Sequence, residues 1–171
     1  MGMATGVLVS EEEYPHTSYE PDCEFEDGVL IERNVGTKDH GKLQGFVFAY
    51  FLKLRKIWGI HAFIEQRVRL RQGKYMVPEI CVYQGIEPPD QVFQTPPLLW
   101  IEILSPEARP LRVNRKVKDI LQFGAPYVWV IDPETLDSHL HTAEGSTALT
   151  NGILRIPGTP IEIMLHQVFE D

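Results

Sequence analysis

Two short segments of this sequence are apolar at both odd and even positions. They cover residues 75–83 and 98–104. The strands of a half-exposed sheet alternate apolar with polar side chains, whereas strands that are covered on both faces do not alternate. We therefore expect these two segments to be the central strands of a sheet that is covered on both sides.

Two other segments have the periodicity of helices. The first begins after Thr37, a favourable N-cap residue, and ends at Trp58-Gly59, with apolar residues three and four positions apart. The second covers 111–123 and ends at Gly124, where glycine commonly terminates a helix. The order of strand, helix and strand after residue 98 predicts a crossover connection.

Antiparallel strands are expected at both ends of the chain. Asp27-Gly28 between short apolar runs predicts a hairpin over 23–34, and turns between 138 and 156 predict a meander. Segment 60–70 alternates and predicts one half-buried strand. The expected fold is α/β (α+β): a mixed central sheet flanked by helices, with an antiparallel N-terminal hairpin and a C-terminal meander.

The length of 171 residues predicts one domain. We place it over 23–171, after an acidic, mobile N-terminal arm over 1–22. Cys23 and Cys81 lack the spacing of a zinc site or of a disulfide framework. Without a signal peptide or a long apolar run, the sequence favours a cytoplasmic protein that has no contact with a membrane.

The net charge of −8 argues against tight, indiscriminate binding to DNA, because an acidic protein repels phosphates. The charge is unevenly distributed, however. Residues 1–39 hold ten acids and two bases, which accounts for the whole surplus. Basic blocks over 40–74 and 109–118 flank the stretch 75–108, which has five acids and no base. This order suits a metal site with phosphate contacts on either side.

A glutamate interrupts each central apolar segment, namely Glu79 and Glu102. An ionised carboxylate in such surroundings costs several kcal/mol unless it is paired, protonated or bound to a metal. If the two strands are neighbours, the two carboxylates can converge on Mg²⁺ or Mn²⁺. The alternative is that either glutamate lies at a strand end or pairs with an arginine.

Lys116 borders the buried face of the second helix, which Val113, Val117 and Ile120 define. It is the one base of its block that can bury its stem and direct its ammonium along the sheet, although it could also be an ordinary surface lysine. Two carboxylates and a lysine would form a metal-dependent phosphodiesterase site, with the lysine orienting or activating water.

Several motifs in order resemble one known family. They are Cys-Glu-Phe-Glu-Asp-Gly-Val-Leu (23–30), His40-Gly41, Val-Pro-Glu-Ile (77–80), Trp-Ile-Glu-Ile-Leu-Ser-Pro (100–106), Lys116 and Gly-Ala-Pro-Tyr-Val-Trp-Val-Ile-Asp-Pro (124–133). Residues 20–170 resemble the Uma-type restriction-endonuclease-like family of the PD-(D/E)XK nuclease superfamily. The resemblance implies a bacterial protein with a restriction-endonuclease-like core and Mg²⁺-dependent hydrolysis of DNA.

The resemblance also assigns roles to residues. Pro78-Glu79 matches the Pro-Asp motif, Glu102 matches the central acid, and Glu24 and His40 match an early glutamate and histidine. The chain departs from the superfamily pattern in having glutamate at 79, and Leu104 where the superfamily lysine would stand. Lys116 matches the lysine that takes this role in the Uma-type family.

The resulting catalytic candidates are Glu24, His40, Glu79, Glu102 and Lys116. The metal ligands are expected to be Glu79, Glu102 and the backbone carbonyl of Ile103. His40 could instead be a hydrogen-bonded core residue, and Glu24 could be one more solvated acid of its segment.

Arg67 and Arg69 share one face of the segment 60–70, and Arg115 points to solvent on the second helix, so these three are candidates for contact with DNA. They could equally be solvated. A second hypothesis is a non-catalytic nucleic-acid-binding module, or a homo-oligomeric interaction module that uses Trp58, Phe123 and Trp129. We expect a homo-oligomer, most simply a dimer.

Overall fold

The computed structural model describes residues 8–34 and 36–170. A six-stranded sheet lies at its centre, in the order β10 (Gly145–Ala148), β9 (Ser138–Thr142), β8 (Tyr127–Ile131), β7 (Leu99–Ile103), β6 (Ile80–Gln84) and β3 (Ile60–Ile64). Strands β7 and β8 are parallel, and the other neighbours are antiparallel. The mixed sheet that the sequence predicts is confirmed.

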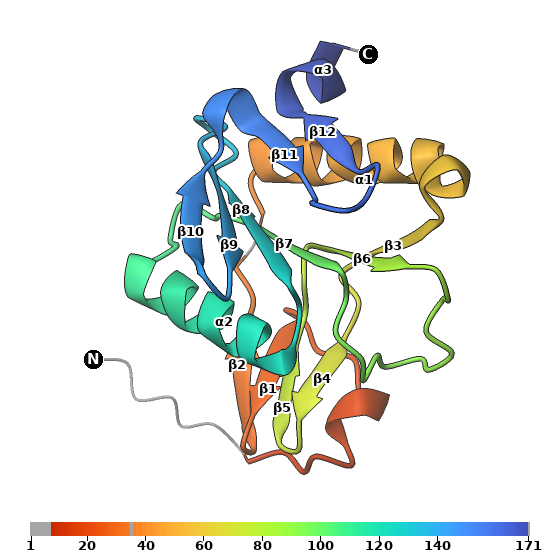
Figure 1. Cartoon of the computed structure of the whole chain (residues 1–171). Coiled ribbons are helices and arrows are strands. Elements are labelled where there is room, and N and C mark those ends of the chain that lie inside the picture. The colour runs from red at the N-terminus through yellow and green to blue at the C-terminus, as the bar shows by residue number, and fades with distance from the viewer. Residues whose placement is uncertain (1–7, 35, 171) are drawn as a thin grey trace.

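One long helix covers each face of this sheet. Helix α1 (Lys38–Trp58) lies on one side and α2 (Pro110–Phe123) on the other (Figure 1). Phe51 of α1 packs in one apolar cluster with Ile101 and Trp129, and Ile120 of α2 packs in the other cluster with Trp100. Trp100 and Ile101 are adjacent in β7, so its successive side chains enter opposite clusters, as the continuous apolar pattern requires.

Local signals in the sequence determine where these helices begin and end. The Thr37 side chain accepts a hydrogen bond of 3.3 Å from the His40 N–H at the start of α1. Gly59 (φ 62°) and Gly124 (φ 114°) end α1 and α2 in the left-handed conformation that favours glycine. Both helix predictions are confirmed.

A second, antiparallel sheet lies beside the first, at the bottom of Figure 1. Its strands are, in order, β2 (Val29–Glu32), β1 (Cys23–Glu26), β5 (Lys74–Met76) and β4 (Val68–Arg71). Asp27 (φ 49°) and Gly28 (φ 90°) form the turn of the β1–β2 hairpin, as their sequence predicts.

The prediction of one strand over 60–70 is wrong. Glu65 has a φ of 49°, and the chain leaves the central sheet there and enters the small one. The segment 75–83 is interrupted as well, between Met76 and Ile80, where Pro78 cannot donate to a strand ladder. The Glu65 N–H donates to the Glu79 carbonyl over 3.3 Å, so both crossings between the sheets occur at the same place.

The C-terminal part contains β11 (Ile153–Arg155), β12 (Glu162–Met164) and α3 (Leu165–Glu170). Strands β9 and β10 pair as the meander predicts, but β11 pairs with β12 instead of with β10. The short 3₁₀ helix η2 (Thr150–Gly152) precedes β11, and Asn151 within it has a φ of 56°. Leu154 of β11 then packs in the same cluster as α1.

The expected arm over 1–22 lies partly outside the described residues, and its described part is packed against the small sheet. It includes a short 3₁₀ helix, η1 (Tyr14–His16). Tyr14 is fully buried and packs on Phe25 and Tyr75. Its hydroxyl donates to the Cys23 carbonyl over 2.6 Å. These contacts argue against a mobile arm over residues 8–22. The domain boundary at residue 22 stays a prediction.

The three apolar residues that suggested an oligomer surface do not form one. Trp129 is fully buried, and Trp58 and Phe123 are partly buried against the two cores. No helix in the described part of the chain has the length and apolar character to cross a membrane.

Candidate active site

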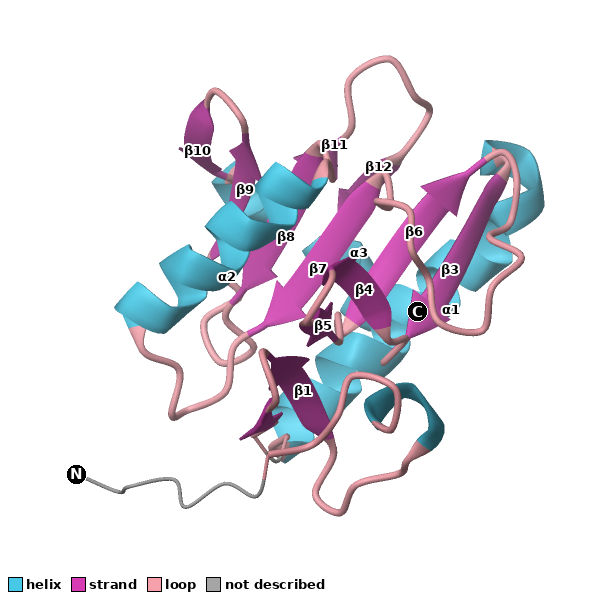
Figure 2. Cartoon of the chain, turned by 90° about the horizontal axis from the view of Figure 1, so that it is seen from below, coloured by secondary structure: helices cyan, strands magenta, loops and turns pink. Residues whose placement is uncertain are grey.

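Glu24, Glu102 and Lys116 meet between the two sheets and α2. The Lys116 Nζ donates to Glu24 Oε1 and to Glu102 Oε2, each over 3.1 Å. Glu24 comes from β1 of the small sheet and Glu102 from β7 of the central sheet. The lysine of α2 therefore connects two carboxylates from separate sheets. Figure 2 shows α2 lying along one face of the central sheet, near β8.

Glu102 is on this face because it shares the strand parity of Trp100. The Trp100 Nε1–H donates to Glu102 Oε1 over 2.7 Å, while Oε2 accepts from Lys116. The Glu102 side chain is 11% exposed. Both of its oxygens thus have a partner, as buried carboxylate oxygens require.

Glu24 is held by the backbone between β5 and β6. Its Oε1 accepts from the Val77 N–H over 3.1 Å in addition to Lys116. The Glu24 side chain is only 9% exposed. Glu24 is therefore not one more solvated acid of its segment.

The pKa values of Glu102 and Lys116 are both shifted from their ordinary values. Burial raises the pKa of Glu102 above its ordinary value, and the nearby Lys116 charge opposes that effect. Burial alone would lower the pKa of Lys116, but the charges of Glu102 and Glu24 outweigh it and raise the pKa instead. Lys116 therefore stays an ammonium ion, in a site with two carboxyl groups and one fixed positive charge.

Glu79 has a separate set of partners. Its Oε1 is 3.3 Å from both Arg33 and the His40 Nε2, and its Oε2 accepts from the Gln44 amide over 2.9 Å. Glu79 directly precedes β6 and pairs with an arginine, which is the arrangement that the alternative hypothesis expects. His40 is 8% exposed on the buried face of α1, at its N-terminal end.

These contacts shift the two titratable groups in opposite directions. Burial would raise the pKa of Glu79, but the His40 hydrogen bond and the Arg33 charge bring it below its ordinary value. The hydrogen bond to Glu79 raises the pKa of His40 against the opposing effect of burial. The geometry thus favours an ionised Glu79 beside a protonated His40.

One cavity of about 450 Å³ brings the two groups together. Ile80 pairs with Ile101 in the antiparallel register of β6 and β7, which places Glu79 at the end of the ladder beside Glu102. Glu24, His40, Glu79, Glu102, Ile103 and Lys116 all line this cavity. The structure therefore brings together every catalytic and metal candidate of the sequence analysis.

The oxygen donors of this cavity fit a hard divalent cation. Glu79 and Glu102 offer carboxylate oxygens, and Mg²⁺ in proteins is commonly held by one or two carboxylates with several waters retained. Over residues 8–34 and 36–170, no group of three or more His, Cys, Asp or Glu residues is placed to hold a metal ion. Any such ion would therefore depend on these two carboxylates for its side-chain ligands, and water or substrate would supply the rest.

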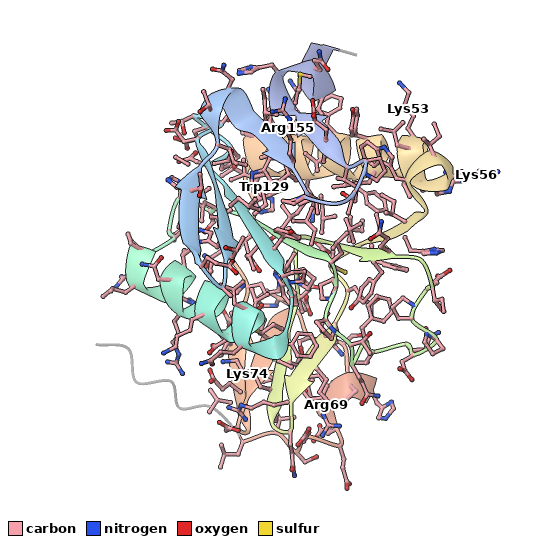
Figure 3. All side chains as sticks on the ribbon, in the orientation of Figure 1. Lys53, Lys56, Arg69, Lys74, Trp129 and Arg155 are labelled. Atoms are coloured by element: carbon pink, nitrogen blue, oxygen red, sulfur yellow. The ribbon has the colours of Figure 1, made fainter. Side chains whose placement is uncertain are left out.

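The arginines expected to contact DNA are engaged elsewhere. Arg67 lies over the Tyr14 ring and 3.6 Å from Asp22, and Arg69 pairs with Glu11 over 2.7 Å. Arg115 lies 3.2 Å from Glu26. None of these three lines the cavity. Figure 3 shows Arg69 and Lys74 at the small sheet, at the bottom of the view.

Sequence reasoning missed three residues that hold the carboxylates, although two of them had a detectable signal. Gln44 follows His40 by one helical turn, and Trp100 precedes Glu102 by two strand positions, so each shares a face with its partner. Arg33 is one of two bases among ten acids, but no spacing connects it with Glu79.

Comparison with known proteins identifies a matching family and a matching fold. The model of the Uma2 family, described as "Putative restriction endonuclease", matches residues 11–162. A crystal structure titled as a "putative nuclease belonging to DUF820" from Anabaena variabilis superposes with a TM-score of 0.81 at 20% sequence identity. The match covers 95% of this chain and 98% of that chain, which shows that they share a fold. Among curated proteins no sequence matches this chain.

Proposed function

This chain belongs to the Uma2 family of "Putative restriction endonuclease" proteins, and from that premise we propose that it hydrolyses phosphodiester bonds of DNA. The reaction would use a divalent metal ion, Mg²⁺ or Mn²⁺. Glu79, Glu102 and the Ile103 carbonyl would hold the ion, which supplies stabilisation of the charge that develops on the phosphate.

The observation that carries this proposal is the Glu24–Lys116–Glu102 cluster on the wall of a cavity that also contains Glu79. Burial of charged groups costs free energy. A protein in which well-packed apolar residues of similar volume replace a buried ion pair is often equally stable or more stable. Stability alone does not require this cluster. Its groups are those of a metal-dependent phosphodiesterase.

Each side chain has a distinct task in the proposed reaction. Lys116 orients the attacking water and offsets negative charge on the phosphate, because its ammonium lines the cavity. Glu24 positions Lys116 through the bond to Nζ. His40, with Arg33 and Gln44, positions the carboxylate of Glu79.

The test is the cleavage of supercoiled plasmid and of labelled duplex oligonucleotides by the purified chain in Mg²⁺ or Mn²⁺. We expect Glu102→Gln, which keeps the size of the side chain and removes its charge, to lose on the order of a thousandfold in rate. Glu134→Gln, at an exposed position that does not line the cavity, is the matched control and should cleave as the wild type does. Equal cleavage by wild type and Glu102→Gln would refute the proposal.

A second function is favoured by the close pairing of Glu79 with Arg33, which occupies a proposed metal ligand. In that case the chain binds nucleic acid without cutting it. Salt-dependent binding of DNA without cleavage in any divalent metal would support this function, since phosphate contacts weaken as salt rises.

Homodimer formation remains part of the proposal, and sedimentation equilibrium tests it. A monomer at all concentrations would exclude it.

A further inference from the structure

The cavity has a cationic wall that the proposed chemistry does not use. Arg109, the N-cap residue of α2, and Arg112 in its first turn both line the cavity, and both are exposed. Arg33 and Lys116 also line it, but their charges are already matched by Glu79, Glu24 and Glu102.

Arg109 and Arg112 differ from the other bases near the site in having no carboxylate partner among the described residues. By contrast, the basic side chains along β4 and β5, and Arg115 on α2, each contact an acid of the N-terminal segment. The positive charge that remains available to a ligand at this cavity is therefore that of Arg109 and Arg112.

The positions of these arginines are unfavourable for the helix itself. Cations destabilise the first turn of a helix, where acids are favoured, yet the first turn of α2 has no acidic residue. The Arg109 side chain makes no capping hydrogen bond, unlike Thr37 at the start of α1. The stability of α2 therefore does not explain the arginines at positions 109 and 112.

The ligand these arginines suit is a phosphate and not a base. Among the described residues that line the cavity there is no Phe, Tyr or Trp on which a base could stack. Arginine binds phosphate oxygens with two parallel hydrogen bonds, and contacts of this kind position a nucleic acid without selecting its sequence.

We propose that Arg109 and Arg112 bind the phosphates next to the scissile phosphodiester and hold the nucleic-acid strand across the cavity. This inference rests on the proposed function, because it takes the Glu79–Glu102–Lys116 site as the place of cleavage. It assigns DNA contact to the start of α2 and not to Arg67, Arg69 and Arg115.

The test compares two variants that each remove two positive charges. One is the double variant Arg109→Ala, Arg112→Ala. The control is Lys53→Ala, Lys56→Ala, which changes two exposed lysines at the C-terminal end of α1, far from Arg69 and Lys74 in Figure 3. Binding of a fluorescein-labelled DNA duplex is measured by anisotropy in EDTA, which prevents cleavage, over a series of salt concentrations.

The arginine variant should bind roughly tenfold more weakly at low salt, and the slope of log affinity against log salt should fall by about 2. The lysine variant should keep the wild-type slope. In Mg²⁺ the arginine variant should raise KM more than it lowers kcat, because it loses contacts to substrate that are remote from the reacting atoms.

The outcomes separate the two proposals. If the wild type cleaves DNA and the arginine variant binds and cleaves as the wild type does, this inference is overturned while the proposed function stands. If both double variants lose affinity equally, the inference is overturned as well, because net charge alone explains the loss. A wild type that neither binds nor cleaves DNA overturns both. If the arginine variant binds weakly while Glu102→Gln cleaves as the wild type does, the phosphate contacts at the start of α2 are supported and the proposed function is refuted.

Discussion

The ammonium group of Lys116 separates two carboxylates that would otherwise face each other with little solvent. It hydrogen-bonds Glu24 and Glu102, whose side chains are 9% and 11% exposed. Removal of one partner from a buried ion pair leaves an uncompensated charge, which costs far more than the pair contributes when intact. Lys116 thus contributes both to the stability of the folded protein and to the proposed chemistry.

We expect Lys116→Met to lower the free energy of unfolding by about 3 kcal/mol near neutral pH. Burial already raises the pKa of Glu102, and loss of the lysine raises it further, so protonation at lower pH should relieve part of the deficit. Urea unfolding at acidic and neutral pH measures this. Lys118→Met, exposed on the same helix, is the control and should change stability by less than about 0.5 kcal/mol. A deficit that does not depend on pH would contradict the account.

The His40–Glu79 pair predicts a second pH dependence. The hydrogen bond to Glu79 raises the pKa of His40 above its ordinary value of 6.5, so its stabilising effect is complete below that value and is lost as pH rises through the folded-state pKa. The pKa of Glu79 is lowered, so its effect is present above its unfolded value and is lost as pH falls through the folded-state pKa.

The difference in unfolding free energy between wild type and His40→Gln should therefore be greatest near pH 6 and should shrink toward pH 8. Thermal or urea unfolding across this range measures it. A difference that grows with pH would show that His40 is not protonated beside Glu79.

At the level of residues, the sequence predicted the cluster but not how it is held. A carboxylate within an otherwise apolar strand identified Glu102, and helical periodicity identified Lys116, since both signals are local in the sequence. Arg33 reaches Glu79 from a segment 46 positions away, a contact that no local pattern encodes.

Among the elements, the largest departure from expectation is the pair of breaks at Glu65 and Pro78. The alternation of 60–70 resumes after Glu65 and the apolar run of 75–83 resumes after Glu79, so periodicity alone does not show that the chain changes sheets there. Pro78 was the available signal, because proline is excluded from the interior of a central strand. The breaks matter for the site, since they bring the Val77 N–H to Glu24 and place Glu79 outside the β6 ladder.

At the start of helix α2 we predict a conflict between the stability of the protein and its binding of DNA. Arg109→Ser would supply an N-cap side chain that can accept a backbone hydrogen bond, and we expect it to raise the free energy of unfolding by about 1 kcal/mol. The same change removes a proposed phosphate contact and should weaken DNA binding. Thermal melting and anisotropy titration of one protein sample measure both. A variant that is less stable, or one that binds DNA better, would contradict this view of α2.

For the whole molecule, the uneven charge has a structural explanation that the sequence did not provide. Acids of the N-terminal segment pair with the basic strands, as Glu11 does with Arg69 and Asp27 with Arg71. The sequence showed that the surplus of −8 lies in residues 1–39 and does not exclude nucleic acid. It did not show that these acids pair with the bases over 67–74 of the first basic block, because the pairing depends on how the N-terminal segment packs around Tyr14.

The central claim is that Glu79 and Glu102 together hold a divalent cation. Calorimetric titration of Mn²⁺ into wild type, Glu79→Gln, Glu102→Gln and the control Glu134→Gln tests it directly. The account predicts that wild type and Glu134→Gln bind Mn²⁺ alike and that the other two variants bind it at least about tenfold more weakly. Failure of the wild type to bind Mn²⁺, or equal binding by all four proteins, would contradict the claim.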